Sequence, residues 1–363
     1  MKRPLPAYLR PVKPAPATAH APVATPDPAR PAVVFNNVSI IFGDQPKTAL
    51  PLADEGQDRA AIREATGQVL GVHDCSLSVA EGEILVLMGL SGSGKSTLLR
   101  AVNGLNPVVR GHVGLRLPEG MVDVTNASPA TLRRVRLNTV AMVFQQFGLL
   151  PWRTVRENVG LGLELAGQSR KQRRARVDEE LATVGLSDWA DRKVGDLSGG
   201  MQQRVGLARA FATDAPILLM DEPFSALDPL IRARLQDDLL EMQAKARRTI
   251  IFVSHDLDEA FKLGNRIALM EGGRIVQIGT AREIIQNPAS GYVQEFVAHM
   301  NPMAVLTAAD LAEPGDAAGV ALRPDLPARE VMAALVGVDA LPVAGLGRVT
   351  RAGVLARLVE PRR

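Results

Sequence analysis

The sequence predicts an α/β protein with a parallel sheet at its centre. Short apolar runs typical of buried strands, among them 84–88, 217–220 and 249–253, alternate with segments of helical periodicity. The first of these runs ends at a glycine-rich turn, after which residues 96–103 continue as a helix. Strands that alternate with helices build parallel sheets, so we expect a sheet core covered by helices.

The composition narrows the class of protein. Of 363 residues, 46% are hydrophobic and 22% are charged, as in a globular protein with a full-sized core. The longest apolar runs are far shorter than the ~20 residues that span a bilayer, so we expect work at a membrane only through a partner. The single cysteine, Cys75, excludes an internal disulfide and fits a reducing cytosol. The net charge of +3 is too small to argue for nucleic acid.

Other segments complete the predicted organisation. Residues 1–31 hold nine of the 25 prolines and no continuous apolar segment, so we predict a disordered basic tail rather than a secretory signal. A polar, helix-like insert at 54–67 interrupts the following strands, and a helical subdomain is predicted at about 146–212. The remaining predicted strands are 33–35, 38–42, 75–79 and 141–144, with a hairpin of 266–270 and 274–279.

The strongest local signal is a complete phosphate-loop pattern, GxxxxGK[ST], between a predicted strand and a predicted helix. Glycines allow successive backbone N–H groups to converge on phosphates, and the helix N-terminus adds its positive end. Lys95 would place its charge on the β- and γ-phosphates, and the Ser96 hydroxyl would be a ligand of Mg²⁺. A chance glycine turn is the alternative, which this context makes rare. The predicted nucleotide-binding residues are Gly89, Leu90, Ser91, Gly92, Ser93, Gly94, Lys95, Ser96 and Thr97.

Two adjacent carboxylates, Asp221 and Glu222, follow the apolar run 217–220. They would emerge at the carboxyl end of a central strand, where α/β sheets bind ligands. Two like charges are costly to bury side by side. A shared Mg²⁺ and an attacking water would explain why two carboxylates are adjacent at this position. Asp221 is therefore predicted to hold the metal through water, and Glu222 to polarise the nucleophilic water. A pair that only caps a turn is the alternative.

The segment 197–204 reads Leu-Ser-Gly-Gly-Met-Gln-Gln-Arg. It resembles the LSGGQ-type signature of ATP-binding-cassette (ABC) ATPases, with methionine in place of the usual glutamine. The resemblance covers about residues 32–295 and implies a P-loop ATPase with a RecA-like core plus the helical subdomain. The signature would aim the N–H groups of a helix at a γ-phosphate. The residues assigned to this contact are Ser198, as N-cap, with Gly199, Gly200 and Met201.

Four further residues match elements of the family in order. Phe42 resembles the aromatic that stacks on adenine, although a core aromatic would look the same. Gln145 resembles the glutamine of the Q-loop, and Asp228 the aspartate of the D-loop. His255 resembles the switch histidine that senses the γ-phosphate, with a purely structural histidine as the alternative.

The resemblance has consequences for cofactors and assembly. It implies that ATP and Mg²⁺ are bound, that Glu222, His255 and Gln145 are catalytic, and that Ser96, Gln145 and Asp221 (through water) hold the metal. One chain has a single phosphate loop and a single signature. Complete sites would therefore need a homodimer in which two copies sandwich two ATP molecules.

Within the family, the chain is similar to the ATPase subunits of importers for glycine betaine, proline and choline. The similarity rests on the phosphate-loop sequence, on the runs 228–232 and 255–260, and above all on the extra stretch 47–72; Pro223, where alanine is usual, departs from it. It implies a peripheral protein on the cytoplasmic face of the inner membrane. The implied partners are integral-membrane permease subunits and, indirectly, a periplasmic or lipid-anchored substrate-binding protein, with no nucleic acid.

The apolar run 149–152 favours transport, because it would suit docking of a permease helix. A place for Trp152 in the core of the helical subdomain is the alternative. A soluble ABC ATPase that acts on nucleic acid or ribosomes is the competing function, but such proteins typically carry tandem cassettes or long coiled-coil insertions, and this chain has neither.

The last part of the chain, 296–363, is too short for the two CBS (cystathionine β-synthase-like) modules with which such importers often end. Residues 323–333, 340–343 and 347–358 resemble one shortened CBS unit. We therefore expect a short α/β regulatory region, with a degenerate stabilising tail as the alternative.

Overall fold

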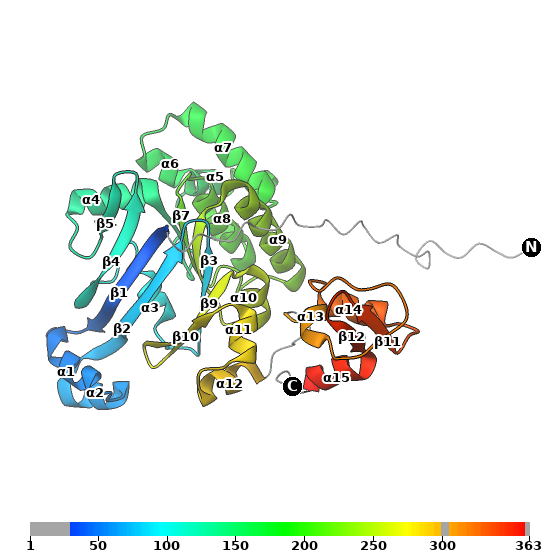
Figure 1. Ribbon diagram of the computed structural model, residues 1–363. Helices are drawn as coiled ribbons and strands as arrows, with labels where there is room; N and C mark the ends of the chain where they lie inside the picture. The colour runs from blue at the N-terminus through cyan, green and yellow to red at the C-terminus, as the bar shows by residue number, and fades with distance from the viewer. Residues whose placement is uncertain (1–29, 299–304, 360–363) are drawn as a thin grey trace, which may run out of the picture.

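A computed structural model describes residues 30–298 and 305–359 of the chain (Figure 1). Residues 1–29 of the predicted tail lie outside the described residues. Within the two described ranges, none of the helices combines the length and the apolar character that crossing a bilayer requires.

The core is a six-stranded sheet in the order β10-β9-β3-β8-β7-β6. Its strands run parallel except for β10, which pairs with β9 as an antiparallel hairpin. Every residue of β3, β7 and β8 is buried, because helices cover one face of the sheet, and a second, antiparallel sheet together with one helix covers the other. The predicted α/β class is confirmed. The strands are β3 (Ile84–Met88), β6 (Val140–Val143), β7 (Ile217–Asp221), β8 (Thr249–Val253), β9 (Arg266–Glu271) and β10 (Arg274–Gly279).

A second, antiparallel sheet lies beside the core in the order β2-β1-β4-β5 (Figure 1). The segments predicted as separate strands at 33–35 and 38–42 form one strand, β1. Its register shifts between Phe35 and Val38, where Asn37 adopts a φ of 50° and forms a bulge. The strands are β1 (Pro31–Phe42), β2 (Val69–Ala80), β4 (Arg110–Leu117) and β5 (Gly120–Asp123).

The predicted helix-like segment 54–67 contains one helix, α2, and two further short helices that were not predicted precede it between β1 and β2. Ile62 of the insert is fully buried with Ile41 and Leu70 of the adjoining strands in a small apolar cluster. Asp54 accepts two hydrogen bonds from the Arg110 guanidinium, at 2.7 and 2.8 Å, which ties the insert to β4. The insert comprises η2 (Pro46–Ala49), α1 (Leu50–Asp54) and α2 (Arg59–Thr66).

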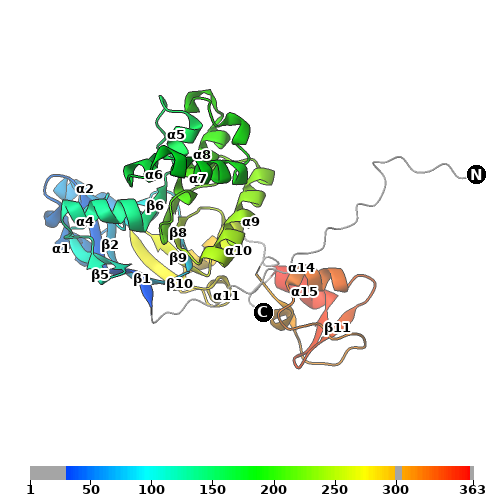
Figure 2. The same ribbon diagram turned by 90° about the horizontal axis from the view of Figure 1, so that it is seen from above.

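Four helices, α5 to α8, gather at one end of the central sheet (Figures 1 and 2). All four fall in the range 146–212, and their apolar faces belong to the same core cluster as β7. Helix α3 is shorter than the predicted helix 96–103. Besides η2, α1 and α2, the helices of the first described range are α3 (Lys95–Leu99), α4 (Pro129–Arg134), η3 (Val135–Thr139), α5 (Val155–Val159), α6 (Leu161–Leu165), α7 (Arg170–Thr183), η4 (Ser187–Trp189), η5 (Val194–Asp196), α8 (Gly199–Phe211), α9 (Pro229–Ala246), α10 (Leu257–Leu263), α11 (Ala281–Gln286) and α12 (Gly291–Ala298).

The second described range forms a small unit with an apolar cluster of its own. The carboxylate of Asp310 accepts a hydrogen bond from Gln286 at 3.0 Å and pairs with Arg282 at 2.5 Å, so α11 is joined to this unit. Its similarity to a shortened CBS unit stays a prediction. The elements are α13 (Ala308–Leu311), α14 (Ala328–Ala334), β11 (Ala340–Val343), β12 (Gly347–Thr350) and α15 (Arg351–Val359).

Candidate functional site

The phosphate-loop segment connects the end of β3 to the start of α3. Gly89, Gly92 and Gly94 have φ angles of 140°, 79° and 103°, which favour glycine over other residues. At Gly89 a Cβ would lie 2.1 Å from the Met270 carbonyl oxygen, so no side chain fits there. The backbone N–H groups of Gly92 and Gly94 have no acceptor in the described part of the chain. They are therefore available to donate to phosphate oxygens.

Lys95 lies beneath this loop. Its Nζ donates to the carbonyl oxygens of Gly89 at 2.8 Å and Leu90 at 2.9 Å. Burial lowers the pKa of Lys95, while the carboxylates of Glu222 and Asp221 act in the opposite direction and favour the charged form. The ammonium group is thus held at the loop by carbonyl oxygens, which an anionic ligand could replace.

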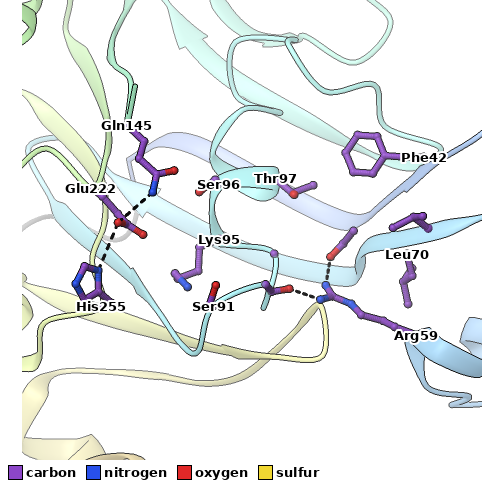
Figure 3. Close-up of a pocket in the computed structure, with 14 residues that line it drawn as sticks. Phe42, Arg59, Leu70, Ser91, Lys95, Ser96, Thr97, Gln145, Glu222 and His255 are labelled. Atoms are coloured by element: carbon purple, nitrogen blue, oxygen red, sulfur yellow. Dashed lines mark hydrogen bonds and ion pairs between the residues drawn. The ribbon is translucent and has the colours of Figure 1, made fainter. Parts of the chain in front are cut away.

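The loop opens into a pocket of about 570 Å³ (Figure 3). Phe42 stands in its wall with 38% of its surface exposed, so the alternative of a core aromatic does not describe it. Ser91, Ser96 and Thr97 come from the loop and α3, and three further predicted residues reach the pocket from other elements. The lining residues are Phe42, Arg59, Val69, Leu70, Gly71, Ser91, Gly92, Gly94, Lys95, Ser96, Thr97, Gln145, Glu222 and His255.

The first carboxylate, Asp221, is completely buried at the end of β7. It accepts a hydrogen bond from the Ser96 hydroxyl at 2.6 Å and pairs with the Arg100 guanidinium at 2.9 Å. The pairing offsets the cost of burying its charge. Sequence reasoning missed Arg100, although its position four residues after Ser96 places both on one face of a helical turn.

The other predicted catalytic residues, Gln145 and His255, lie next to the second carboxylate, Glu222. Gln145 Nε2 donates to Glu222 Oε2 at 3.2 Å, and His255 Nδ1 lies 3.5 Å from the same oxygen (Figure 3). Glu222 has a φ of 49°, a left-handed conformation that is uncommon outside glycine and recurs at active sites. A carboxylate in the lining of this pocket can accept a proton from a bound water.

Gln203 holds the backbone around Glu222 and was also missed. This buried residue of α8 donates from Nε2 to the Glu222 carbonyl oxygen at 3.2 Å. Its Oε1 accepts from the Ala226 amide at 3.1 Å. The helix after the signature is therefore tied to the segment that carries the second carboxylate. The sequence offered no local sign of this contact, which spans 19 positions.

The oxygen atoms near the pocket fit a magnesium ion. The Ser96 hydroxyl and the Asp221 carboxylate are in contact, and the amide oxygen of Gln145 accepts no hydrogen bond within the described ranges. Hydroxyl, carboxylate and amide oxygens are the hard ligands that Mg²⁺ takes. Among residues 30–298 and 305–359, no group of three or more His, Cys, Asp or Glu residues could hold a metal alone.

The signature residues lie apart from this pocket. Ser198 is the N-cap of α8, and its hydroxyl accepts from the Met201 amide at 3.4 Å. Ser198, Gly199, Gly200 and Met201 are absent from the pocket lining, and so is Asp228, the N-cap residue of α9. Within one chain, the phosphate loop and the signature therefore do not form a common site.

The run 149–152 lies between Gln145 and α5. Trp152 is 68% exposed, so its alternative placement in the core of the helical subdomain is wrong. Its carbonyl oxygen accepts from Lys193 Nζ at 2.7 Å. The backbone is thus anchored while the indole faces solvent.

A phosphate loop with free amides, next to a strand end that carries a candidate base, places the protein among the phosphate-loop nucleoside triphosphatases. Comparisons with known proteins narrow this class. The ABC transporter family profile matches residues 72–225. The chain is 50% identical over 278 residues to the glycine betaine/proline betaine transport system ATP-binding protein ProV of Escherichia coli (strain K12), a match that covers 77% of this chain and 68% of ProV.

A second relative is the trimethylamine N-oxide transport system ATP-binding protein TmoW of Ruegeria pomeroyi. It is 45% identical over 285 residues, which cover 78% of this chain and 82% of TmoW. The dimeric post-hydrolysis structure of the ATP-binding cassette MJ0796, bound to ADP and Pi, matches with a TM-score of 0.59 and 29% identity over 68% of this chain and 98% of that chain. The chain belongs to the family of ABC transporter ATP-binding proteins, and its activity is ATP hydrolysis coupled to transport. These comparisons give no support to the alternative of a nucleic-acid or ribosome ATPase.

Proposed function

We propose that this protein is a peripheral subunit on the cytoplasmic face of the inner membrane that works as a homodimer with Mg²⁺. It hydrolyses ATP to power import of quaternary amines such as choline or glycine betaine through separate permease subunits. A periplasmic or lipid-anchored binding protein would deliver the amine to that permease. The observation that supports a homodimer is that the signature residues lie apart from the pocket within one chain. A second copy of the chain would bring a signature to each phosphate loop.

The residues of the pocket divide the chemistry of hydrolysis among themselves. The free amides of Gly92 and Gly94 and the ammonium of Lys95 would hold the phosphates in place. Glu222 would accept the proton of the attacking water, and His255, which lies beside the same carboxylate oxygen, would contact the γ-phosphate.

Mg²⁺, when bound, would offset the negative charge of the phosphates and of the leaving group. Ser96 and Gln145 would hold it directly, and Asp221 would hold it through water. The ion pair between Arg100 and Asp221 would keep that carboxylate in place beside Ser96.

The substrate class follows from the relatives. The names of ProV and TmoW specify glycine betaine, proline betaine and trimethylamine N-oxide. These compounds share a fully substituted, methylated nitrogen that carries a positive charge. A transported amine with the same group is therefore the class that we propose for the system to which this chain belongs.

Uptake in a reconstituted system tests this proposal. The subunit would be assembled with its permease and binding protein in liposomes, and entry of labelled glycine betaine, choline and trimethylamine N-oxide would be followed with internal ATP. We expect ATP-dependent entry of at least one of the three, lost in the Glu222→Gln variant. Assembly with ATP hydrolysis but without uptake of any methylated amine would contradict the proposed substrate class.

A further inference from the structure

We propose that Arg59, a residue of the insert between β1 and β2, is a positioning residue of the nucleotide site. This inference rests on the proposed ATPase function and concerns the same pocket. Arg59 belongs to none of the motifs of the site. It precedes the phosphate loop by about thirty residues in the chain, a separation of 33 positions from Gly92.

The guanidinium of Arg59 bridges two backbone segments at the pocket wall. Its Nη1 donates to the carbonyl oxygen of Gly92 in the phosphate loop, and its Nη2 donates to the carbonyl oxygen of Gly71 in β2 (Figure 3). The fit is close: a Cβ at Gly273, in the β9–β10 turn, would lie 2.7 Å from Arg59 Nη2. Arg59 therefore fills the space between the insert, the phosphate loop and that turn.

The insert holds Arg59 at this place. Asp58 is the N-cap of α2, and its carboxylate accepts from the Ala61 amide at 2.8 Å. Ile62, on the next turn, is completely buried in the cluster that joins the insert to β1 and β2. Because the start of α2 is capped and its next turn is anchored, the backbone from which the Arg59 side chain extends is held in place.

The contact fixes one peptide group of the phosphate loop from both ends. Arg59 holds the carbonyl of Gly92, and the following amide, that of Ser93, donates to the Leu90 carbonyl oxygen at 3.1 Å. The turn is thereby set, while the amides of Gly92 and Gly94 stay free for phosphate oxygens. A loop that is ordered before the ligand arrives does not have to lose that conformational entropy on binding.

Arg59 also adds charge where a polyphosphate would lie. It forms no ion pair with any carboxylate in the described part of the chain, and its Nε is buried without an acceptor. Burial lowers the pKa of Arg59, but a guanidinium stays charged at neutral pH. Together with Lys95 it gives the pocket two cations, and both would attract the phosphates.

Nucleotide binding and hydrolysis by the full chain test this inference. The variants are Arg59→Ala and Arg59→Lys, with Arg63→Ala as the matched control, because Arg63 lies one turn further along α2 and is exposed. The readouts are Kd for ATP by titration with a fluorescent ATP analogue, KM and kcat of hydrolysis, and the melting temperature. For Arg59→Ala we expect Kd and KM to rise about tenfold, equivalent to ~1.4 kcal/mol. We expect kcat at saturating ATP and the melting temperature to stay near those of Arg63→Ala, and Arg59→Lys to recover part of the loss.

Other outcomes would overturn the inference. A Kd for Arg59→Ala within about twofold of Arg63→Ala would show that Arg59 does not position the loop. A joint fall of kcat and melting temperature, with no recovery in Arg59→Lys, would show a structural role only. The Lys95→Ala variant distinguishes a failure of the Arg59 inference from a failure of the proposed ATPase function. If this variant still bound ATP, the pocket itself would not be the ATP site.

Discussion

Trp152 offers a direct test of the proposed docking of this subunit to permease subunits. Its indole is 68% exposed, whereas the backbone around it is held by the fully buried Asn158. The Asn158 amide donates to the carbonyl oxygens of Leu150 at 3.1 Å and Thr154 at 2.9 Å, and its oxygen accepts from the Leu150 amide at 2.7 Å. Because Trp152 is largely exposed and belongs to none of the apolar clusters of the described residues, the Trp152→Ala variant should keep its fold.

The expected loss at the interface follows from the exposed area. A buried tryptophan covers roughly 150–250 Å². With 68% of Trp152 free, roughly 100–170 Å² remains for a partner to cover, worth about 2.5–4 kcal/mol at ~25 cal/mol per Å². Part of this is offset by the ordering of side chains at the interface. We therefore expect a loss of about 2 kcal/mol, which raises the Kd for the permease at least tenfold.

The assay compares Trp152→Ala with Trp189→Ala, a second partly exposed tryptophan outside the run 149–152. Melting temperature and ATP binding are measured on the isolated subunit, and permease binding is measured by titration of the permease in detergent. Only Trp152→Ala should weaken permease binding, with melting temperature and ATP affinity unchanged in both variants. If Trp152→Ala bound the permease as tightly as the wild type, the docking role would be refuted; a lower melting temperature would instead show that the indole supports the subunit's own fold.

Further predictions concern the site and the core. The Glu222→Gln variant should still bind ATP but lose turnover, because an amide is a far poorer base than a carboxylate. It should accumulate as a nucleotide-bound dimer, which size-exclusion chromatography would detect. Hydrolysis within about threefold of the wild-type rate would rule out the role of Glu222 as base. Gln203→Leu should lower the free energy of unfolding by roughly 1–3 kcal/mol in denaturant titration, because the Ala226 amide loses its acceptor and the Glu222 carbonyl keeps only its donors in Ser225. An unchanged midpoint would contradict this. Burial raises the pKa of the Cys75 thiol to about 11. Iodoacetamide at pH 8 should therefore label the native chain roughly a hundredfold more slowly than the unfolded chain. Rapid labelling of the native chain would show that the thiol is accessible.

The sequence predicted the central strands well because their signal is local. The runs 84–88, 217–220 and 249–253 are continuous and apolar, as strands of a parallel sheet buried on both faces must be. The antiparallel strands β4 and β5 were not predicted. Most of their residues are partly buried or exposed, so their apolar pattern is weak. Strand β4 is defined by its pairing with β1, far away in sequence, and β5 by its pairing with β4.

The same distinction explains which site residues were predicted. The phosphate loop and the carboxylate pair are recognisable from residue types at fixed spacing, and most of these residues line one pocket. Arg59 and Gln203 act through backbone atoms far along the chain, and no pattern of neighbouring residues marks such contacts. Arg100 lies between these two cases. It belongs to no motif, but its helical spacing from Ser96 could have indicated that both residues contact the same partner, Asp221.

The contacts around Glu222 show how permease docking and hydrolysis can be linked. Gln145 holds the side chain of Glu222, and its loop leads directly to Trp152. Gln203 holds the Glu222 backbone from α8, in the same group of helices. His255, by contrast, follows β8 of the central sheet. Gln145, like His255, follows a strand of this sheet, in its case β6. A rotation of helices α5–α8 against the sheet would therefore move Gln203 directly, whereas Gln145 would be affected only through the loop that joins it to α5. In the proposed complex, a permease that held these helices would thereby affect the geometry of the candidate base.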